Sequence, residues 1–507
     1  RSPLFPYTTL FRSMAAAAAV LGLVAVVIGS QPGWWTPSAP EAAAPVQRLA
    51  VLPLRNLSPG TDQALLAEGV SDAIAADLAQ LPGLRVIARS SAQQYKDPAR
   101  MPGEIARALN ADVVVSGSAS AVGPHLEVRL MMTRQSATAP FWSNVFDLDF
   151  DASFAMRREV ARVVAREIRI GITPREEARL LAAGTTHRAA FEHYVRARHF
   201  WSKRTDPDIQ RAAEEFKAAI DADPAYAAAY AGLADCHNQF ATVIVGRPPG
   251  ENRALAMAAA RRGIEIDDRN AEAHAALGFA KLYNWDWAGA DRELTRALEL
   301  NPSYASARVW RAAFLLIHRR FDEAIAEVDM AVELDPLSPI TRTQAGWIRV
   351  HAGRPEDALV PIRQVLETNP DYPWALYQMG GCLCELRRYR ECVEALEKVV
   401  AAAPDSPAFL GSLGLAYAEA GRREDAARVL RRLRALAASR YVTPYAPMLV
   451  CLGLRDMDCF FASLEEGYRQ RINYVAFLNV TPSPARYGFV REDPRFQDLL
   501  RRVGPAQ

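Results

Sequence analysis

A helix-stopping residue recurs along this 507-residue chain at a fixed interval of 34 residues. Proline stops a helix because it has no N–H to donate and its ring clashes with the preceding turn. A fixed period of this length indicates stacked copies of one small unit, none of which can bury its apolar face alone. The recurring positions are Pro224, Asp268, Pro302, Pro336, Pro370 and Pro404. The step from Pro224 to Asp268 is longer than the others because it contains an insertion.

Each unit is expected to contain two helices that cross closely, because small residues recur at matched positions. Gly278, Ala290 and Ala297 hold these positions in one unit, and Gly346 and Ala358 hold two of them in another. Bulky residues such as Leu277 and Leu294 fill the space between them. The units are predicted at about 193–226, 227–270, 271–304, 305–338, 339–372, 373–406 and 407–440, with residues 242–252 of the second unit forming a loop.

The period and the closing Leu-Asn-Pro or Leu-Asp-Pro, as at Leu300–Pro302 and Leu334–Pro336, resemble the tetratricopeptide repeat (TPR). This resemblance implies an all-α superhelix over residues 190–440 with about seven repeats, and a degenerate repeat and cap over 441–507. It also implies that the first helix of each repeat lines a concave face that binds a protein or peptide. The positions expected there are Phe279, Leu282, Tyr283, Val309, Leu316, Trp347, Val350, Trp374 and Tyr377.

A second domain is predicted over residues 48–185, where the pattern is that of an α/β fold. Strands are expected at 48–54, 85–88 and 112–116, an antiparallel hairpin at 126–132 and 141–149, and helices at 62–81, 101–109 and 154–170. The whole chain is therefore expected to be α+β, with a small α/β domain before the TPR superhelix.

This α/β segment is similar to the TolB-amino-terminal-like domain at Ala50–Ser58, Leu81–Arg89, Glu104–Ala106 and Phe141–Trp142. The resemblance implies protein interaction in the cell envelope of a bacterium. In proteins of this architecture the cytoplasmic front is often a winged-helix domain, a nucleotide cyclase or a Ser/Thr kinase. Residues 48–507 carry no motif of any of the three.

The front of the chain contains an apolar run at residues 14–30, which is predicted to be a transmembrane helix or signal anchor. A cleaved signal peptide is the competing interpretation. A Pro/Ala-rich linker follows at 31–47, and residues 1–13 resemble a translated sequencing adapter. The scarcity of Lys and Arg after the run predicts a single-pass protein of the bacterial inner membrane, with residues 31–507 periplasmic or extracytoplasmic.

Motifs for catalysis are missing from the sequence. It contains no phosphate-binding glycine loop, no His-Glu-x-x-His and no Gly-x-Ser-x-Gly, so we expect no enzyme activity, no cofactor and no metal. The net charge of +2 gives no argument for nucleic acid binding. Cys392 is expected to be a buried thiol, Cys382 and Cys384 to point to different sides, and Cys451 and Cys459 to be able to form a disulfide in an oxidising compartment.

The function that these patterns favour is protein interaction within a bacterial transmembrane signalling regulator, of which this chain is the exported sensor or scaffold half. One alternative is a stand-alone envelope assembly scaffold. Another is the accessory half of a truncated adenylate cyclase, Ser/Thr kinase or winged-helix transcriptional regulator, whose cytoplasmic domain is missing from this sequence.

Overall fold

The computed structural model describes most of the chain after residue 45. The described residues are 46–58, 61–81, 83–96, 100–122, 125–135, 137–149, 153–168, 185, 187–242, 247–481 and 483–504. The apolar run 14–30, the segment 1–13 and nearly all of the linker 31–47 lie outside them. Within the described ranges, none of the helices has the length and apolar character needed to cross a membrane.

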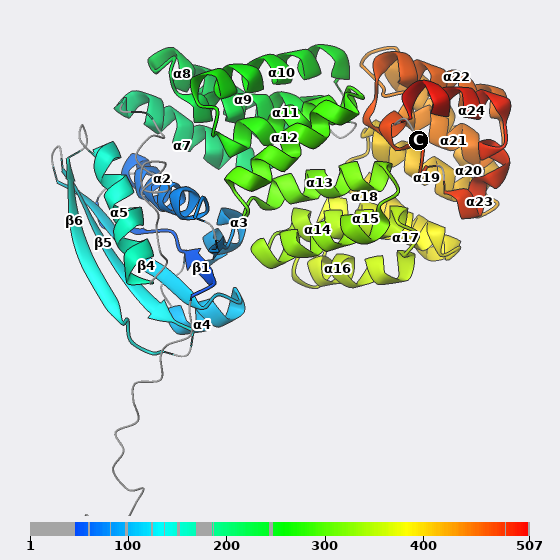
Figure 1. Ribbon diagram of the computed structural model, residues 1–507. Helices are drawn as coiled ribbons and strands as arrows, with labels where there is room; N and C mark the ends of the chain where they lie inside the picture. Colours follow the sequence, from blue (N-terminus) through cyan, green and yellow to red (C-terminus); the bar gives the residue numbers. More distant parts are fainter. Residues whose placement is uncertain are drawn as a thin grey trace, which may run out of the picture. The chain divides into compact units, whose positions relative to one another are not determined.

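A mixed sheet forms the first part of the described chain (Figure 1). Its main path runs β3-β1-β4-β5-β6, and β2 pairs with β4 beyond β1. The pairs β1–β3, β1–β4 and β2–β4 are parallel, whereas β4–β5 and β5–β6 are antiparallel. The strands are β1 (Arg48–Val51), β2 (Arg55–Asn56), β3 (Arg85–Val86), β4 (Val113–Val122), β5 (His125–Arg134) and β6 (Trp142–Asp149).

Successive residues of one strand alternate between the two faces of this sheet, as the period of two requires. Val113 and Val115 pack in one core cluster, while Val114 between them packs in another. The first cluster lies under α2 (Thr61–Leu78) and α5 (Ser153–Glu167). The second lies under α3 (Arg89–Ala92) and α4 (Pro102–Ala108).

The predicted α/β pattern is thus confirmed for its hairpin and its helices, with several differences. The strand expected at 48–54 ends at Val51 and is followed by the separate β2, and the strand expected at 85–88 ends at Val86. The strand expected at 112–116 continues to Val122, because it pairs along its whole length with β5 and forms a second hairpin. A short helix, α3, and a 3-10 turn, η1 (Gln93–Tyr95), follow β3, where no element was predicted.

Helical pairs make up the rest of the chain. From α9 onward, each predicted unit starts at the first residue of a helix, at 227, 271, 305, 339, 373 and 407. The first helices of the units are α7 (Arg188–Ser202), α9 (Ala227–Phe240), α11 (Ala271–Tyr283), α13 (Ala305–Ile317), α15 (Pro339–His351), α17 (Pro373–Glu385) and α19 (Pro407–Glu419). The second helices are α8 (Asp206–Ala222), α10 (Pro249–Ile266), α12 (Trp287–Leu300), α14 (Phe321–Leu334), α16 (Pro355–Thr368), α18 (Tyr389–Ala402) and α20 (Arg423–Ala437).

The small residues at the predicted helix crossings lie against bulky side chains of the partner helix. A Cβ atom on Gly278 would be 2.8 Å from Leu294 Cγ, and one on Gly346 would be 2.6 Å from Ile362 Cγ1. Contacts this short require the neighbouring side chain to move, so glycine permits the close approach of the two helices. Ala290 is completely buried at the same kind of crossing.

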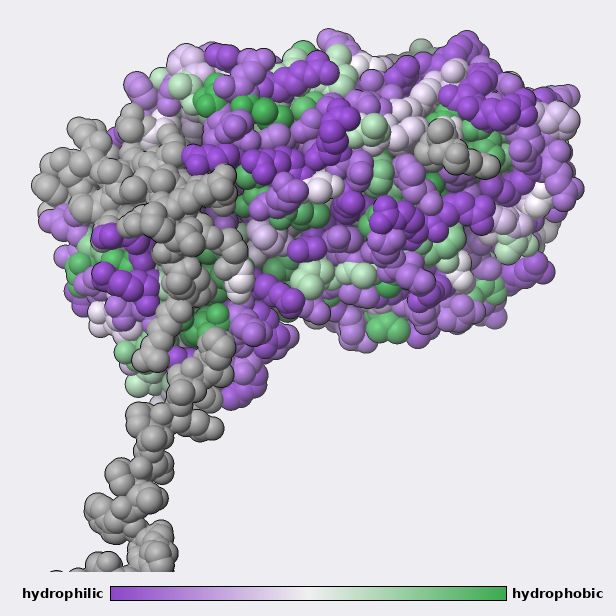
Figure 2. Space-filling view, viewed as in Figure 1, coloured by the Kyte–Doolittle hydropathy of each residue, from purple (hydrophilic) through white to green (hydrophobic). Residues whose placement is uncertain are grey.

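The carboxyl-terminal part contains the expected degenerate pair, α21 (Tyr445–Leu454) and α22 (Met457–Gln470). A 3-10 turn, η2 (Asn473–Phe477), and two short helices, α23 (Pro484–Arg491) and α24 (Pro494–Val503), follow. Figure 2 shows that the visible surface of the array is mostly hydrophilic, with hydrophobic residues scattered singly or in small groups.

Two predictions about this part of the chain were wrong in detail. The loop expected at 242–252 already becomes helix α10 at Pro249, because proline is well suited to the first turn of a helix. Cys392 is not a free thiol. It lies in the first turn of α18 opposite Cys384 in the last turn of α17, with Cα atoms 5.4 Å apart, and the two form a disulfide. Cys451 and Cys459 form a second disulfide with the same spacing along the chain.

Candidate functional site: the inner face of the helical array

The first helices of the repeats place one equivalent side chain after another along the array. A residue with positive φ lies in the turn after several of these first helices, for example Arg204, Trp285 and Gly353. Six residues before these three lie Arg198, Phe279 and Trp347, and the same position of α9, counted from its start, is Asp235. We call this set of equivalent surfaces the inner face. Its chemistry changes from charged in the first two repeats to aromatic and apolar afterwards.

The apolar part of the inner face is covered by the chain's own carboxyl-terminal segment. We call the surfaces of α11, α13 and α15 under residues 471–481 the covered face. Phe477 is only 4% exposed, and its ring centroid is 4.9 Å from Trp347 and 6.1 Å from Tyr283. The side-chain amide of Asn479 donates a hydrogen bond of 3.0 Å to the main-chain oxygen of Ile317, at the end of α13.

Two arginines fix the start of this segment. Arg253 of α10, which is 3% exposed, donates to the main-chain oxygen of Arg471 at 2.8 Å and to Asn473 Oδ1 at 2.9 Å. Burial lowers the pKa of Arg253 to about 10, so the guanidinium stays charged at neutral pH. Arg471 in turn donates to the main-chain and side-chain oxygens of Asn284, at 2.9 and 2.6 Å, and lies over the ring of Trp285.

The predicted groove residues have unequal positions in this arrangement. Phe279, Leu282, Tyr283 and Leu316 are buried, whereas Val309, Trp347 and Val350 are half-buried. The prediction from the repeats lacked the covering segment, because residues 471–481 carry none of the repeat pattern. The role of these residues in binding an external partner therefore stays a prediction.

Trp374 and Tyr377 are half-buried and contact the next repeats. Phe409 lies against both, with ring centroids 5.1 Å from Trp374 and 5.3 Å from Tyr377. The hydroxyl groups of Tyr377 and Tyr445 are 3.1 Å apart, and Ser412 donates to Tyr377 at 3.2 Å. These contacts give the two aromatic residues a packing role between repeats.

The charged part of the inner face retains side chains that are half-exposed. Trp201 lies between two guanidinium groups, with its ring centroid 3.4 Å from Arg204 Cζ and 5.5 Å from Arg198 Cζ. Arg198 also forms an ion pair of 3.4 Å with Glu272 of α11. Asp235, Tyr304 and Tyr372 lie within electrostatic range of Arg204. We call the following residues the polar cluster: Arg198, Trp201, Arg204, Asp235, Glu272, Tyr304 and Tyr372.

Two buried polar groups of the polar cluster lack a hydrogen-bond partner in the described part of the chain. Asp235 is 3% exposed, and its Oδ1 atom has no hydrogen-bond partner there; the indole N–H of Trp201 is also unpaired. Burial, together with the charge of Glu272, raises the pKa of Asp235 to about 7. Burial lowers the pKa of Arg204, which lies over the ring of Trp201. Unsatisfied buried groups of this kind are uncommon in folded proteins.

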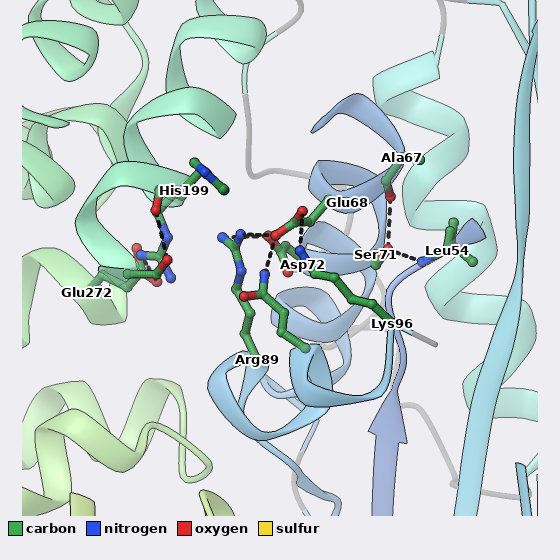
Figure 3. Close-up of polar contacts among 12 residues, drawn as sticks. Leu54, Ala67, Glu68, Ser71, Asp72, Arg89, Lys96, His199 and Glu272 are labelled. Carbon is green, nitrogen blue, oxygen red and sulfur yellow. Dashed lines mark hydrogen bonds and ion pairs between the residues drawn. The ribbon is translucent and has the colours of Figure 1, made fainter. Parts of the chain in front are cut away.

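A second charged cluster lies where α2 and α3 approach α7 (Figure 3). Arg89 forms ion pairs with Glu68 at 2.8 Å and with Asp72 at 2.6 Å, and Lys96 binds Glu68 at 3.0 Å. Burial raises the pKa of Asp72 to about 6, although Arg89 opposes the shift. Burial also acts to raise the pKa of Glu68, but Arg89 and Lys96 outweigh it and hold the pKa below its usual value. His199 of α7 lies near this cluster, and burial and Lys203 lower its pKa.

The sheet domain also contacts the turns between repeats through buried polar groups. The main-chain N–H of Val86 donates to Ser303 Oγ at 3.0 Å. The hydroxyl groups of Ser90 and Ser91 both donate to Asp335 Oδ1 at 2.7 Å, and the N–H of Leu337 donates to Ser91 Oγ at 2.9 Å. The turn between α14 and α15, which contains Asp335 and Pro336, therefore also binds the sheet domain.

The chemistry that this arrangement supports is binding through ion pairs, hydrogen bonds and aromatic contacts. Within the described ranges, no three or more His, Cys, Asp or Glu residues are grouped in a way that could hold a metal ion. The sequence reasoning missed the polar cluster because it selected aromatic groove positions. The position of Asp235, which matches that of Phe279 and Trp347 when counted from the helix start, is the signal that could have found it.

Comparison with known proteins supports the assignment of the repeats. One family model described as tetratricopeptide repeat matches residues 349–413, and another with the same description matches 194–242 and 275–339. A protein named putative adenylate cyclase 3, from Rhizobium meliloti (strain 1021), is 27% identical over 237 residues, which are 46% of this chain and 40% of that protein. The chain thus aligns with less than half of that relative's length.

Solved structures with a similar fold include the APC/C hetero-tetramer Cut9–Hcn1, with a TM-score of 0.43 and 12% identity over 70% of this chain and 64% of that chain. YrrB, described as a TPR protein with an unusual peptide-binding site, has a TM-score of 0.27 and 21% identity over 38% of this chain and 94% of its own. On the evidence of the family models and the helical pairs, the array of this chain contains tetratricopeptide repeats.

Proposed function

We propose that this chain is a non-catalytic protein-interaction module that binds a protein or peptide on the inner face of its repeats. The proposal includes its place as the exported sensor or scaffold half of a bacterial transmembrane regulator. TPR arrays are generally protein-interaction modules, which supports the first part. The second part rests on the sequence alone.

The observation that carries the proposal is the polar cluster. Asp235 Oδ1 and the indole N–H of Trp201 are buried without a hydrogen-bond partner in the described part of the chain, and the guanidinium of Arg204 lies over the Trp201 ring. A peptide group offers both a hydrogen-bond acceptor and a donor, so it can satisfy an arginine and a carboxylate at once. Tyr304 and Tyr372 add aromatic surface of the kind that anchors a bound segment.

The test is site-specific photo-crosslinking in cells. Trp201 is replaced by p-benzoylphenylalanine, and the matched control carries the same residue at Glu299, whose side chain is 58% exposed on α12. We expect one discrete adduct from position 201 and none of the same mass from position 299. Absence of an adduct at 201, or the same adduct from both positions, contradicts binding at the polar cluster.

Export is supported by the two disulfides, Cys384–Cys392 and Cys451–Cys459, because structural disulfides persist mainly in oxidising compartments. In the proposed periplasmic location, alkylation of the denatured protein after quenching in acid should modify Cys236 and Cys382 and leave the other four cysteines oxidised. Modification of all six before reduction would contradict export.

The relative named putative adenylate cyclase 3 favours a second candidate, in which this chain is the accessory half of a cyclase. A continuous genomic read across codon 14 decides between the candidates. A cyclase reading frame that continues into Met14 would identify the accessory half of a cyclase. A kinase or winged-helix frame would identify another regulator, and a start codon at Met14 with nothing upstream would favour a stand-alone scaffold.

A further inference from the structure

The segment that lies on the covered face comes from far along the chain. Residues 471–481 follow α22 and pack against it, and they also contact α11, α13 and α15. The contacts of Asn479 with Ile317 and of Arg253 with Asn473 join residues that are 162 and 220 positions apart. The segment is therefore held on two sides. Ile472, Val475 and Leu478 pack in the core of the carboxyl-terminal helices, whereas Asn473, Phe477 and Asn479 contact the earlier repeats.

The contacts of this segment are those of a bound peptide. Phe477 inserts between Tyr283 and Trp347, and aromatic anchors of this kind contribute most in peptide recognition. Asn479 donates to the oxygen of Ile317, the last residue of α13, whose carbonyl has no partner within its own helix. Arg253 donates hydrogen bonds to one main-chain oxygen and one carboxamide oxygen of the segment.

The recognised side chains define a pattern. Asn473 meets Arg253, Phe477 follows four residues later between the two aromatic rings, and Asn479 follows two residues after that at the end of α13. Main-chain groups of the segment also form hydrogen bonds with one another, such as the one from Val480 N–H to Phe477 O at 2.9 Å. The covered face forms few other hydrogen bonds with polar groups of the segment.

We propose that the covered face is a binding site for a peptide with asparagine, phenylalanine and asparagine at this spacing, that residues 471–481 are its resident ligand, and that a partner carrying the same pattern displaces them. This inference rests on the proposed function, since it names the ligand class of one part of the same array. It differs in site, because the polar cluster does not touch the segment.

The experiment uses the full chain with Phe477→Ala and Asn479→Ala, which removes two of the three recognised side chains and leaves Asn473 bound to Arg253. The probe is a fluorescein-labelled, acetylated peptide with the sequence of residues 471–481, Arg-Ile-Asn-Tyr-Val-Ala-Phe-Leu-Asn-Val-Thr. Fluorescence anisotropy should show at least tenfold tighter binding to this variant than to the wild-type chain. A peptide with alanine in place of its phenylalanine should lose at least tenfold in affinity.

The matched control is Phe489→Ala, an aromatic residue that is 37% exposed and lies outside the covered face. It should bind the peptide as weakly as the wild-type chain does. Arg253→Ala is a second opened variant, which retains Phe477 and Asn479 but loses the clamp on the segment, and it should also bind the peptide more tightly than the wild-type chain.

The proposal is overturned if both opened variants keep their cooperative thermal transition and neither binds the peptide more tightly than the wild-type chain. Equal binding of the peptide and of its alanine version would overturn it as well. Crosslinking from position 201 tests the polar cluster independently, so failure there with success here would remove the proposed partner site and leave this one standing.

Discussion

The polar cluster and the covered face lie at equivalent positions of different repeats, but only the covered face is covered by residues 471–481. Arg198 and Asp235 hold the place that Phe279 and Trp347 hold further along the array. Leaving apolar surface in water costs about 25 cal/mol per Å², so the aromatic positions gain from being covered by the chain itself. The charged positions gain nothing from such a cover. Arg198 remains half-exposed, whereas Asp235 is buried and its pKa is raised. The repeat thus determines where a side chain lies, and the chemistry of that side chain determines whether another segment covers it.

The largest expected effect comes from removing the side chain that closes the covered face. Phe477→Ala should lower the free energy of unfolding by about 3–4 kcal/mol, because deletion of a buried phenylalanine loses its burial and leaves a cavity. The midpoint of urea unfolding, followed by circular dichroism, measures this. Phe489→Ala should cost less than about 1 kcal/mol. Equal losses in the two variants would show that Phe477 is not a specific contact of the inner face.

The second effect is a pH dependence that belongs to the polar cluster. The pKa of Asp235 is raised to about 7 in the folded protein, so the folded state binds more protons than the unfolded state below that pH. Stability therefore falls as pH rises from about 4 through 7. At about 1.4 kcal/mol per pKa unit, Asp235→Asn should gain roughly 2–3 kcal/mol on the wild-type chain between pH 5 and pH 8.

Urea unfolding of the two proteins at pH 5 and at pH 8 checks this prediction. The Phe477→Ala variant serves as the control, because its loss of stability should not change in this pH range. If the gain of Asp235→Asn is the same at both pH values, the carboxyl group of Asp235 is ionised without penalty, and the polar cluster is open to water.

A smaller effect locates the boundary of the covered face. Trp374 and Tyr377 pack against Phe409, and the hydroxyl group of Tyr377 lies 3.1 Å from that of Tyr445. Their joint replacement by alanine should lower the free energy of unfolding by about 2 kcal/mol, less than full burial would give, because both are half-buried. An unchanged melting temperature with reduced partner capture would return these residues to the binding role that the repeat pattern suggested.

The smallest expected effect on stability comes from Arg204→Ala. The guanidinium lies over the ring of Trp201, and such a contact contributes about 0.5–2 kcal/mol. Its loss is partly offset by relief of the burial that lowers the pKa of Arg204, so we expect a change below about 1 kcal/mol. The yield of the crosslinked adduct at position 201 should nevertheless fall severalfold. A large loss of stability with an unchanged adduct would make Arg204 a structural residue.

The architecture of the array could be predicted from the sequence because it depends on local signals that repeat. The helix starts at 227, 271 and 305 follow from the 34-residue period and from small residues such as Gly278. The first unit is harder to align, because α8 has 17 residues where α12 has 14, so counting back from Pro224 would shift Arg198 by three positions. The left-handed turn at Arg204, which the sequence does not reveal, restores the alignment.

The contents of the inner face could not be predicted in the same way. The cover over Tyr283 and Trp347 comes from a segment without the repeat pattern, and its position depends on distant contacts such as the one from Asn479 to Ile317. The disulfide between Cys384 and Cys392 was missed for a related reason. It joins two helices whose facing sides become known only when their crossing is known. The resemblance of residues 48–185 to the TolB-amino-terminal-like domain stays a prediction.

Hydrogen–deuterium exchange of residues 471–481 in the full chain tests the central claim most directly, since the claim is that this segment occupies the covered face. Amides of this segment, such as Val475 and Val480, donate within it, and Phe477 is buried. We predict that these amides exchange as slowly as those of α13 and that Arg253→Ala accelerates them at least tenfold. Exchange of the segment within seconds, while α11, α13 and α15 remain protected, would contradict the account.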